Sequence, residues 1–436
     1  MLTLFIILFL GLSLFPSNIL YFITAVFTCL VYYLRNLNFF FCSSLSVNGE
    51  IIINDEVSLF INLLLFFIMY ISFLNSNQFK TGLKTVGLVL FILIFFCFIV
   101  FNTFNLFHLY FFYEASLIPI LYIIIKWGSY PERSISAIII ISYTLLFGVP
   151  ILIIIISVYT TTHTWFIPFF LTYKRTKLVS LLVFLCFAVK LPIYGLHYWL
   201  PIAHVEAPTF GSVILARILL KLGGVGLIRV LPILDLEFIK SNLLGYFIIF
   251  TVFRAIVCCF QSDFKRLIAY SSVSHIIVIP LLIVSNNILS LQRLIIIMLF
   301  HGLSSTIIFI RVGILYTIYS SRQLILIRGL ILISPLIRIL IVLTFFYTLS
   351  APPFPSYIAE VYFMMSTYIL TSKIIYVFIP FAFLGLVYNL NWLRRILFGN
   401  SYNYSNSSTH ISYINVSLFI LVLLFRLIII FLFMQF

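Results

Sequence analysis

Charged residues inside long apolar runs are the features of this sequence that could do chemistry. Of ten acidic residues, Glu114 and Glu360 fall well inside such runs, and Glu206 lies near the end of another. Lys190 and Lys221 are the most deeply placed lysines, each among Leu, Ile and Val. Carboxylates and amines exchange protons, and burial can bring a lysine pKa towards neutrality whereas arginine stays charged. These residue types therefore predict proton transfer.

The cost of burying a charge favours a functional role over an accidental one. A lone charge at the membrane centre costs about 2.5 to 3.5 kcal/mol on insertion scales. A Glu–Lys pair about 4 Å apart gains about 4 kcal/mol at an effective dielectric constant near 20, and moving one charge across about 100 mV requires about 2.3 kcal/mol. The energy gained and lost as such a pair forms and breaks is thus sufficient to move a proton against a membrane potential of this size. The alternative is that each pair only docks two helices.

Histidines offer further sites for a proton relay. His197 follows Lys190 by seven residues, which predicts the same helical face, and His275 and His301 fall inside later apolar runs. For each histidine, a packing role is an equal alternative. His301 is the strongest candidate because residues 302–305, Gly-Leu-Ser-Ser, are small or hydroxylated and could order water.

Long apolar helices must position these groups, because 64% of the 436 residues are apolar and only 8% are charged. A spanning helix needs about 20 apolar residues, and such runs fill the chain. We therefore expect an all-α polytopic bundle with about fourteen spans. The runs lie at 2–14, 17–34, 57–74, 84–103, 105–126, 134–158, 178–200, 207–230, 240–260, 264–285, 288–312, 326–371, 373–396 and 411–434.

Prolines interrupt two of these runs. Pro192 falls inside the run at 178–200, and Pro352, Pro353 and Pro355 fall inside the run at 326–371, which is too long for one span. Broken helices at corresponding places are typical of inverted-topology repeats. The expected divisions are N-terminal helices at 1–83, two half-channel repeats at 84–230 and 231–398, and a polar linker with a last helix at 399–436.

Composition also argues against other kinds of partner. The net charge of +15 is scattered along the chain, without the concentrated patch expected for nucleic acid. The six cysteines form no CxxC pair, so neither zinc nor an iron–sulfur cluster is indicated. The histidines of the apolar runs occur singly, which disfavours a haem cytochrome. We therefore expect no metal and no cofactor.

Several strings in the middle third resemble subunit 4 of respiratory complex I, a proton-pumping, antiporter-like family. They are Phe-Tyr-Glu-Ala-Ser-Leu-Ile-Pro at 112–119, Lys-Leu-Pro-Ile-Tyr-Gly-Leu-His at 190–197, Ala-His-Val-Glu-Ala-Pro at 203–208, Leu-Lys-Leu-Gly-Gly at 220–224, and Asp-Phe-Lys-Arg-Leu-Ile-Ala-Tyr-Ser-Ser-Val-Ser-His at 263–275.

The resemblance implies a role for each buried ion. Glu114 and Lys190 look like the pair of the first half-channel, Lys221 like the connecting lysine, and Glu360 like the terminal acid of the second half-channel. His301 matches a histidine that would link Lys221 to Glu360. His197, Glu206 and His275 are secondary candidates. One departure is a set of arginines that such proteins rarely bury: Arg217, Arg254 and Arg311.

The resemblance also implies a setting. The chain would be a multi-pass protein of the mitochondrial inner membrane, without a cofactor of its own, and redox energy would reach it from quinone reduction by NADH. Its partners would be other membrane-arm subunits, especially subunits 2 and 5, together with accessory subunits and lipid. Two alternatives stay open: a subunit of a homologous sodium/proton antiporter, and a membrane scaffold whose buried charges only dock helices.

Overall fold

The computed structural model describes much of the chain between residues 46 and 398. The described residues are 46–48, 52–76, 83–128, 130–167, 176–191, 193, 195–276, 278–285, 288–319, 321–329, 335–352, 357–358, 360–361, 364–365, 368 and 375–398. The predicted runs 2–14, 17–34 and 411–434 lie outside them, as do Pro192, Pro353 and Pro355.

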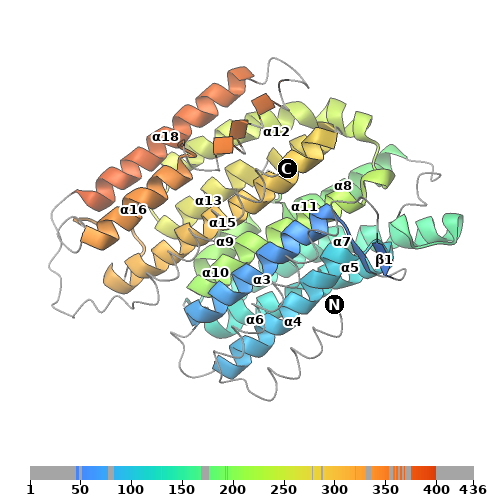
Figure 1. Ribbon diagram of the computed structural model, residues 1–436, viewed down its shortest axis with the longest axis horizontal. Coiled ribbons are helices and arrows are strands. Elements are labelled where there is room, and N and C mark those ends of the chain that lie inside the picture. The colour runs from blue at the N-terminus through green and yellow to red at the C-terminus, as the bar shows by residue number, and fades with distance from the viewer. Residues whose placement is uncertain are drawn as a thin grey trace. The chain divides into compact units, whose positions relative to one another are not determined.

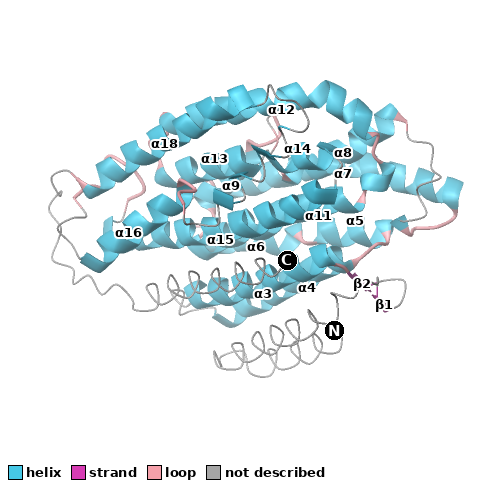
Figure 2. Cartoon of the chain, turned by 45° about the horizontal axis from the view of Figure 1, so that its top comes forward, coloured by secondary structure: helices cyan, strands magenta, loops and turns pink. Residues whose placement is uncertain are grey.

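The described chain is a bundle of apolar helices, which confirms the predicted fold class (Figures 1 and 2). Five of the described helical stretches are long and apolar enough to cross a membrane: Thr85–Asn102, Leu106–Trp127, Arg133–Thr162, Thr209–Arg229 and Arg293–Tyr316. The total of fourteen spans stays a prediction. Sequence patterns did not predict the short antiparallel hairpin of β1 (Ser46–Asn48) and β2 (Ile52–Asn54).

The first of two compact units comprises Met1–Leu191 and Glu206–Ile239. Its described helices are α3 (Glu56–Ser76), α4 (Leu83–Asn102), α5 (Leu106–Ala115), α6 (Leu117–Trp127), α7 (Arg133–Thr162), α8 (Lys177–Lys190), α10 (Thr209–Ile214) and α11 (Leu220–Arg229). Helix α4 packs against α3, α5, α6 and α11, and α8 packs against α7 and α11. Two of its candidate ions, Glu114 on α5 and Lys190 on α8, therefore come from helices that both pack against α7.

Side-chain caps set the starts of the two helices that carry those ions. Asn105 accepts a hydrogen bond from the backbone N–H of Phe107 at the start of α5, and Thr176 accepts one from Val179 at the start of α8. Such caps satisfy N–H groups that have no partner within the helix. Helix α5 ends beside Ser116, where a turn separates it from α6 within one 22-residue apolar stretch.

The second unit comprises Pro192–Val205 and Lys240–Phe436. Its described helices are α13 (Phe264–Ile276), α14 (Val278–Ser285), α15 (Ile288–Tyr319), α16 (Pro335–Thr348) and α18 (Ile375–Leu397); α9 (Trp199–Glu206) and α12 (Leu236–Cys259) each begin or end at its boundary. Helix α15 packs against α13, α14 and α16, and α16 packs against α18. The division into half-channels at 84–230 and 231–398 stays a prediction, as does their inverted relation.

A helix ends shortly before each of the two proline positions that were predicted to interrupt a helix. Helix α8 ends at Lys190, and the next helix, α9, begins only at Trp199. Between them Gly195 adopts a φ of +84°, a left-handed conformation that glycine accommodates without strain. Helix α16 ends at Thr348, and Ser350 has a φ of +51°, which a residue other than glycine rarely adopts. The chain thus leaves the helix beside a candidate ion in each unit.

An ion pair fastens the start of α3 to the end of α11. The Arg229 guanidinium contacts both carboxylate oxygens of Asp55 at 2.7 and 2.8 Å and donates to the Phe101 carbonyl at 2.9 Å. A bidentate pair of this kind fixes orientation as well as charge, so Asp55 serves the packing of the first unit.

Close packing of α11 on α8 depends on glycines. A Cβ at Gly223 would lie 2.9 Å from the Phe187 carbonyl, and one at Gly226 would overlap the Phe187 ring. Gly226→Ala should therefore destabilise the first unit by about 1 to 3 kcal/mol through overpacking. We expect a lower melting temperature of the purified assembly. Gly245→Ala is the matched control, because nothing lies within 4 Å of its Cβ position; equal melting temperatures for both variants would refute the prediction.

Candidate functional site

Lys190 ends α8 as a buried cation whose ammonium group meets the end of α5. Its Nζ donates a hydrogen bond to the Tyr113 carbonyl at 2.7 Å and lies 3.0 Å from the centre of the Tyr113 ring. The same carbonyl accepts a hydrogen bond from the Ser116 hydroxyl at 2.7 Å. Lys190 is only 2% exposed, so carbonyl and ring stabilise the ammonium in place of water.

Glu114 follows Tyr113 directly and points towards α7. A Cβ at Gly148 would lie 3.4 Å from the Glu114 carboxylate and 3.7 Å from the Tyr110 hydroxyl, so the absence of a side chain at Gly148 makes room for both. The Lys190 charge acts on Glu114, but no direct ion pair joins these two described residues. The predicted pair thus consists of a buried ammonium bonded to the Tyr113 carbonyl and a carboxylate on the next residue of α5.

Lys221 lies in the most irregular part of the stretch Thr209–Arg229. A π-helical turn, Leu215–Leu219, separates α10 from α11 and carries the fully buried Arg217. The Lys221 Nζ donates to the Ala216 carbonyl at 3.2 Å, within this turn. Turns of this type expose backbone carbonyls that an α-helix would bond, and they often occur at functional sites.

His197 lies in the second unit and does not share a helix with Lys190. The prediction of a common helical face is wrong, because α8 ends at Lys190 and His197 sits in the turn before α9. The His197 ring instead contacts the guanidinium of Arg254, on α12. The Arg254 guanidinium also lies 5.4 Å from the centre of the Tyr270 ring. A buried arginine therefore has an imidazole and an aromatic ring as partners here.

Glu360, His275 and Ser350 come together in the second unit. The Glu360 carboxylate accepts a hydrogen bond from the Ser350 hydroxyl at 2.5 Å, and one of its oxygens lies 3.7 Å from His275 Nδ1. Ser350 belongs to the irregular segment after α16, and its left-handed backbone places this hydroxyl. The helix interruption therefore supplies a donor to the carboxylate that was predicted to end the second half-channel.

The remaining candidates lie on α9, α11 and α15. His301 lies half-buried on α15, where Ser304 donates to its carbonyl at 3.0 Å. Glu206 is buried at the end of α9. Lys221 belongs to the first unit, and His301 and Glu360 to the second. The link between Lys221 and Glu360 through His301 stays a prediction.

Sequence reasoning missed two polar residues that the structure places inside the second unit. His204 on α9 is fully buried and stacks on Phe309, with ring centres 4.9 Å apart; neither ring nitrogen bonds a described residue. Ser350 is the other, bonded to Glu360. The only signal for Ser350 was its place directly before Ala351 and the proline-rich segment.

Ser350→Ala tests whether the hydroxyl supports the Glu360 carboxylate. Removing one hydrogen bond to a charged group costs about 1.5 to 3 kcal/mol, so we expect the proton-transfer rate through the second unit to fall about tenfold. The measurement is proton translocation in reconstituted vesicles. Ser142→Ala removes an exposed hydroxyl on α7 that bonds only its own helix and should be silent; equal rates for the two variants would contradict the assignment.

Among the described residues, no cluster of three His, Cys, Asp or Glu side chains could hold a metal ion. The candidate groups of each unit are acids, amines and imidazoles; among them the two lysines bond backbone carbonyls and Glu360 bonds a hydroxyl. Such groups can take up and release protons.

Comparison with known proteins places the chain in a membrane-protein family. The profile of the NADH:quinone oxidoreductase/Mrp antiporter transmembrane family matches residues 103–385. NADH-ubiquinone oxidoreductase chain 4 of Chondrus crispus is 33% identical over 360 residues, covering 79% of this chain and 72% of that protein. The chain 4 of Lumbricus terrestris is 35% identical over 57% of each chain. The matches thus cover from about half to three quarters of each of these relatives.

Solved structures share the fold. Respiratory complex I from Thermus thermophilus contains a chain with a TM-score of 0.80 and 20% identity, covering 95% of this chain and 91% of that one. A chain of the Mrp complex from Dietzia sp. DQ12-45-1b gives 0.79 and 16% identity, covering 93% and 80%. Family profile, relatives and fold agree: the chain is an integral membrane protein that belongs to the NADH:quinone oxidoreductase/Mrp antiporter family, with NADH-ubiquinone oxidoreductase chain 4 among its relatives.

Proposed function

We propose that the chain is a proton-translocating membrane-arm subunit of NADH:ubiquinone oxidoreductase. The observation that carries the proposal is the buried Lys190 ammonium, which bonds the Tyr113 carbonyl while Glu114 occupies the next position of the same helix. A lysine that served only to dock two helices would be expected to pair directly with its carboxylate. This one instead bonds the backbone carbonyl of the residue that precedes its predicted partner.

Proton transfer in the first unit follows from that arrangement. With its ammonium on the Tyr113 carbonyl, Lys190 holds a proton; reorientation of either side chain brings the ammonium and the Glu114 carboxylate together. Forming and breaking this pair changes the free energy of the bound proton. The change is comparable with the work of moving one charge across a membrane potential, about 2.3 kcal/mol per 100 mV. The break after Lys190 supports such motion, because no helical turn follows it.

The second unit would complete the path. Glu360 has a hydroxyl donor and an imidazole beside it, which suits a carboxyl group that binds and releases a proton. The subunit itself would hold no cofactor, and NADH oxidation and quinone reduction would take place elsewhere in the complex. The proposed location is the mitochondrial inner membrane, with subunits 2 and 5 and accessory subunits as neighbours.

Isolation of the native assembly tests this function. Purification in a mild detergent through a tag on this chain should recover NADH:ubiquinone reductase activity, together with antiporter-like subunits 2 and 5 identified by mass spectrometry. Recovery of the chain as a stable monomer without reductase activity would contradict the proposal.

A sodium/proton antiporter subunit is the second candidate, because the matched family and one of the similar folds include Mrp antiporters. The two functions differ in their energy source. Proton movement that needs NADH and ignores a sodium gradient supports the first; proton movement driven by sodium alone supports the second.

A further inference from the structure

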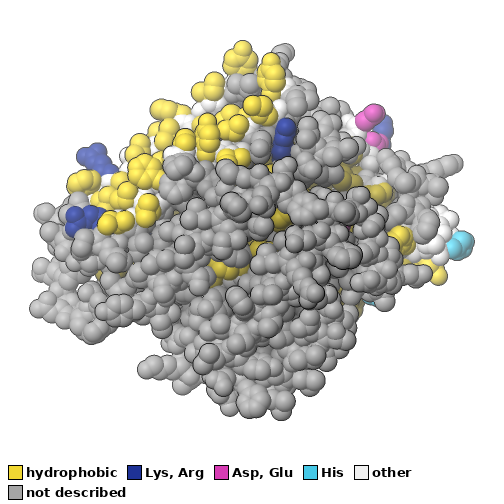
Figure 3. Space-filling view, viewed as in Figure 1, with side chains coloured by type: hydrophobic (Ala, Val, Ile, Leu, Met, Phe, Trp, Pro, Cys, Tyr) yellow, Lys and Arg dark blue, Asp and Glu magenta, His cyan; other side chains and the backbone are white. Residues whose placement is uncertain are grey.

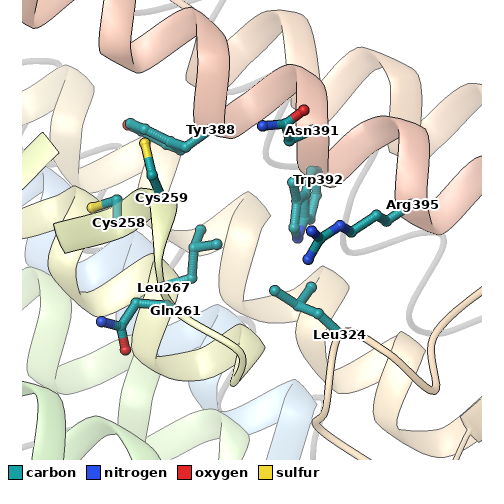
Figure 4. A pocket seen from close by; sticks show the side chains of 9 residues that line it. All are labelled: Cys258, Cys259, Gln261, Leu267, Leu324, Tyr388, Asn391, Trp392 and Arg395. Carbon is teal, nitrogen blue, oxygen red and sulfur yellow. The ribbon is translucent and has the colours of Figure 1, made fainter. Parts of the chain in front are cut away.

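A small pocket that none of Glu360, His275 and Ser350 lines opens in the second unit. It is lined by Cys258, Cys259, Gln261, Leu267, Leu324, Tyr388, Asn391, Trp392 and Arg395 (Figure 4). It lies where α12 ends, α13 begins and α18 approaches its last turn. In a membrane protein, such helix ends lie at the headgroup level.

The polar groups of the pocket are donors suited to an anion. No carboxylate lines it. Arg395 is exposed and makes no hydrogen bond or ion pair with any described residue, although it is a cation with five N–H groups. Trp392 is only 6% exposed, and its indole Nε1 has no partner among the described residues. Figure 4 shows this nitrogen on the same side as the Arg395 guanidinium, across the pocket from Cys259 and Gln261.

The Trp392 ring is clamped in this orientation. Phe264 stacks on it with ring centres 4.8 Å apart, and the Arg311 guanidinium lies 3.9 Å from its centre. Arg311 is itself buried, and it donates to the Thr344 hydroxyl. The indole N–H is thus directed by its neighbours, and a second positive charge lies behind the ring. Both features favour an acceptor that is negatively charged.

Two apolar stripes lead to the pocket. Along α12 and just past its end, exposed apolar side chains recur at helical spacing and end at Phe260, next to the lining residue Gln261. Along α18 they end at Leu390, next to the lining residue Asn391. They are Ile249, Phe253 and Ile256 on α12 with Phe260 directly after it, and Ile379, Phe383, Leu386 and Leu390 on α18. Figure 3 shows hydrophobic side chains over the face around α18, with basic side chains at its edge.

We propose that this pocket binds the phosphodiester of an anionic phospholipid, with its acyl chains along the two stripes. The Arg395 guanidinium matches two phosphate oxygens in its planar fork, and the Trp392 N–H donates to a third acceptor. Free inorganic phosphate shares the charge but has nothing to place on the stripes. Basic pockets between helices and interfacial tryptophans are suited to lipid headgroups on physical grounds. None of the groups proposed to carry protons lines this pocket.

Cys259 provides the readout, because it is exposed and lines the pocket. The intact complex is delipidated, mixed with phosphatidylglycerol vesicles or with inorganic phosphate, and treated with N-ethylmaleimide; labelling of Cys259 is followed by peptide mass spectrometry. Phosphatidylglycerol should slow the labelling and inorganic phosphate should not. Arg395→Ala should need about tenfold more lipid for the same protection, the loss expected for one charge-assisted hydrogen bond.

Two further variants keep the test decisive. Arg394→Ala removes the neighbouring exposed arginine, which does not line the pocket, and should behave as wild type. Trp392→Phe keeps an aromatic ring for the stack on Phe264 and removes the indole N–H with its five-membered ring, so it should weaken protection in the same direction as Arg395→Ala. The proposal is overturned if Arg395→Ala is protected at the wild-type lipid concentration, or if inorganic phosphate or a neutral detergent protects equally well. Protection of Cys259 in the delipidated complex would point to a protein carboxylate instead and would also overturn it.

Discussion

Replacing Glu114 by Gln is expected to lower NADH-driven proton translocation by about two orders of magnitude, the contribution typical of one positioned proton-transfer group. Glutamine keeps the shape of the side chain between Gly148 and Tyr110 but can neither carry a charge nor accept the proton of Lys190. The packing around the site should survive, because the Glu114 side chain makes no hydrogen bond with the described residues. The measurement is proton uptake per NADH oxidised in reconstituted vesicles.

Two matched variants sharpen this experiment. Glu114→Asp keeps the charge on a shorter arm and should retain partial activity. Glu132→Gln removes an exposed carboxylate just before α7 and should pump as wild type. Wild-type pumping by an assembled Glu114→Gln complex would mean that the carboxylate only positions helices.

Lys190→Met is expected to abolish translocation through the first unit to a similar extent. Methionine approximates the length of the lysine stem without its charge, and it removes the donor to the Tyr113 carbonyl. That carbonyl keeps the Ser116 hydroxyl as a partner, so no buried acceptor is stranded. Removing a buried cation also ends its desolvation cost. We therefore expect stability equal to or above that of wild type together with lost pumping, measured by thermal unfolding and proton uptake.

Lys126→Met is the control for that substitution. Lys126 is exposed on α6, where its ammonium donates to the Tyr122 hydroxyl at 2.9 Å. Its loss should leave pumping unchanged. Should Lys190→Met pump normally, the lysine would be a structural cation, and the scaffold interpretation would hold.

Hydrophobic runs predicted the helices well, because a bilayer leaves the chain few alternatives. The runs at 57–74 and 84–103 appear as Glu56–Ser76 and Leu83–Asn102, within two residues at each end. The interruption after Lys190 was also predicted, from Pro192. The hairpin at Ser46–Asn48 and Ile52–Asn54 was not, because two three-residue strands carry too little pattern.

Side-chain partners were harder to predict, because they depend on contacts between distant segments. Charge and burial singled out Glu114 and Lys190, but the partner of the lysine is a backbone carbonyl, which every residue has. Asp55 resembled any loop carboxylate, and only the fold brings it to Arg229, 174 residues later. His197 was predicted on the helical face of Lys190 because the two are seven residues apart. The helix ends at Lys190, so helical spacing does not extend to His197.

The central claim is that Glu114 and Lys190 act as one proton-transferring unit. It is tested most directly by proton uptake per NADH oxidised in wild type, Glu114→Gln, Lys190→Met and the double variant. Residues that act together are non-additive, so the double variant should pump no less than the more damaged single variant. If instead the two losses multiply in the double variant, the two residues act independently, and the proposed exchange of a proton between them is contradicted.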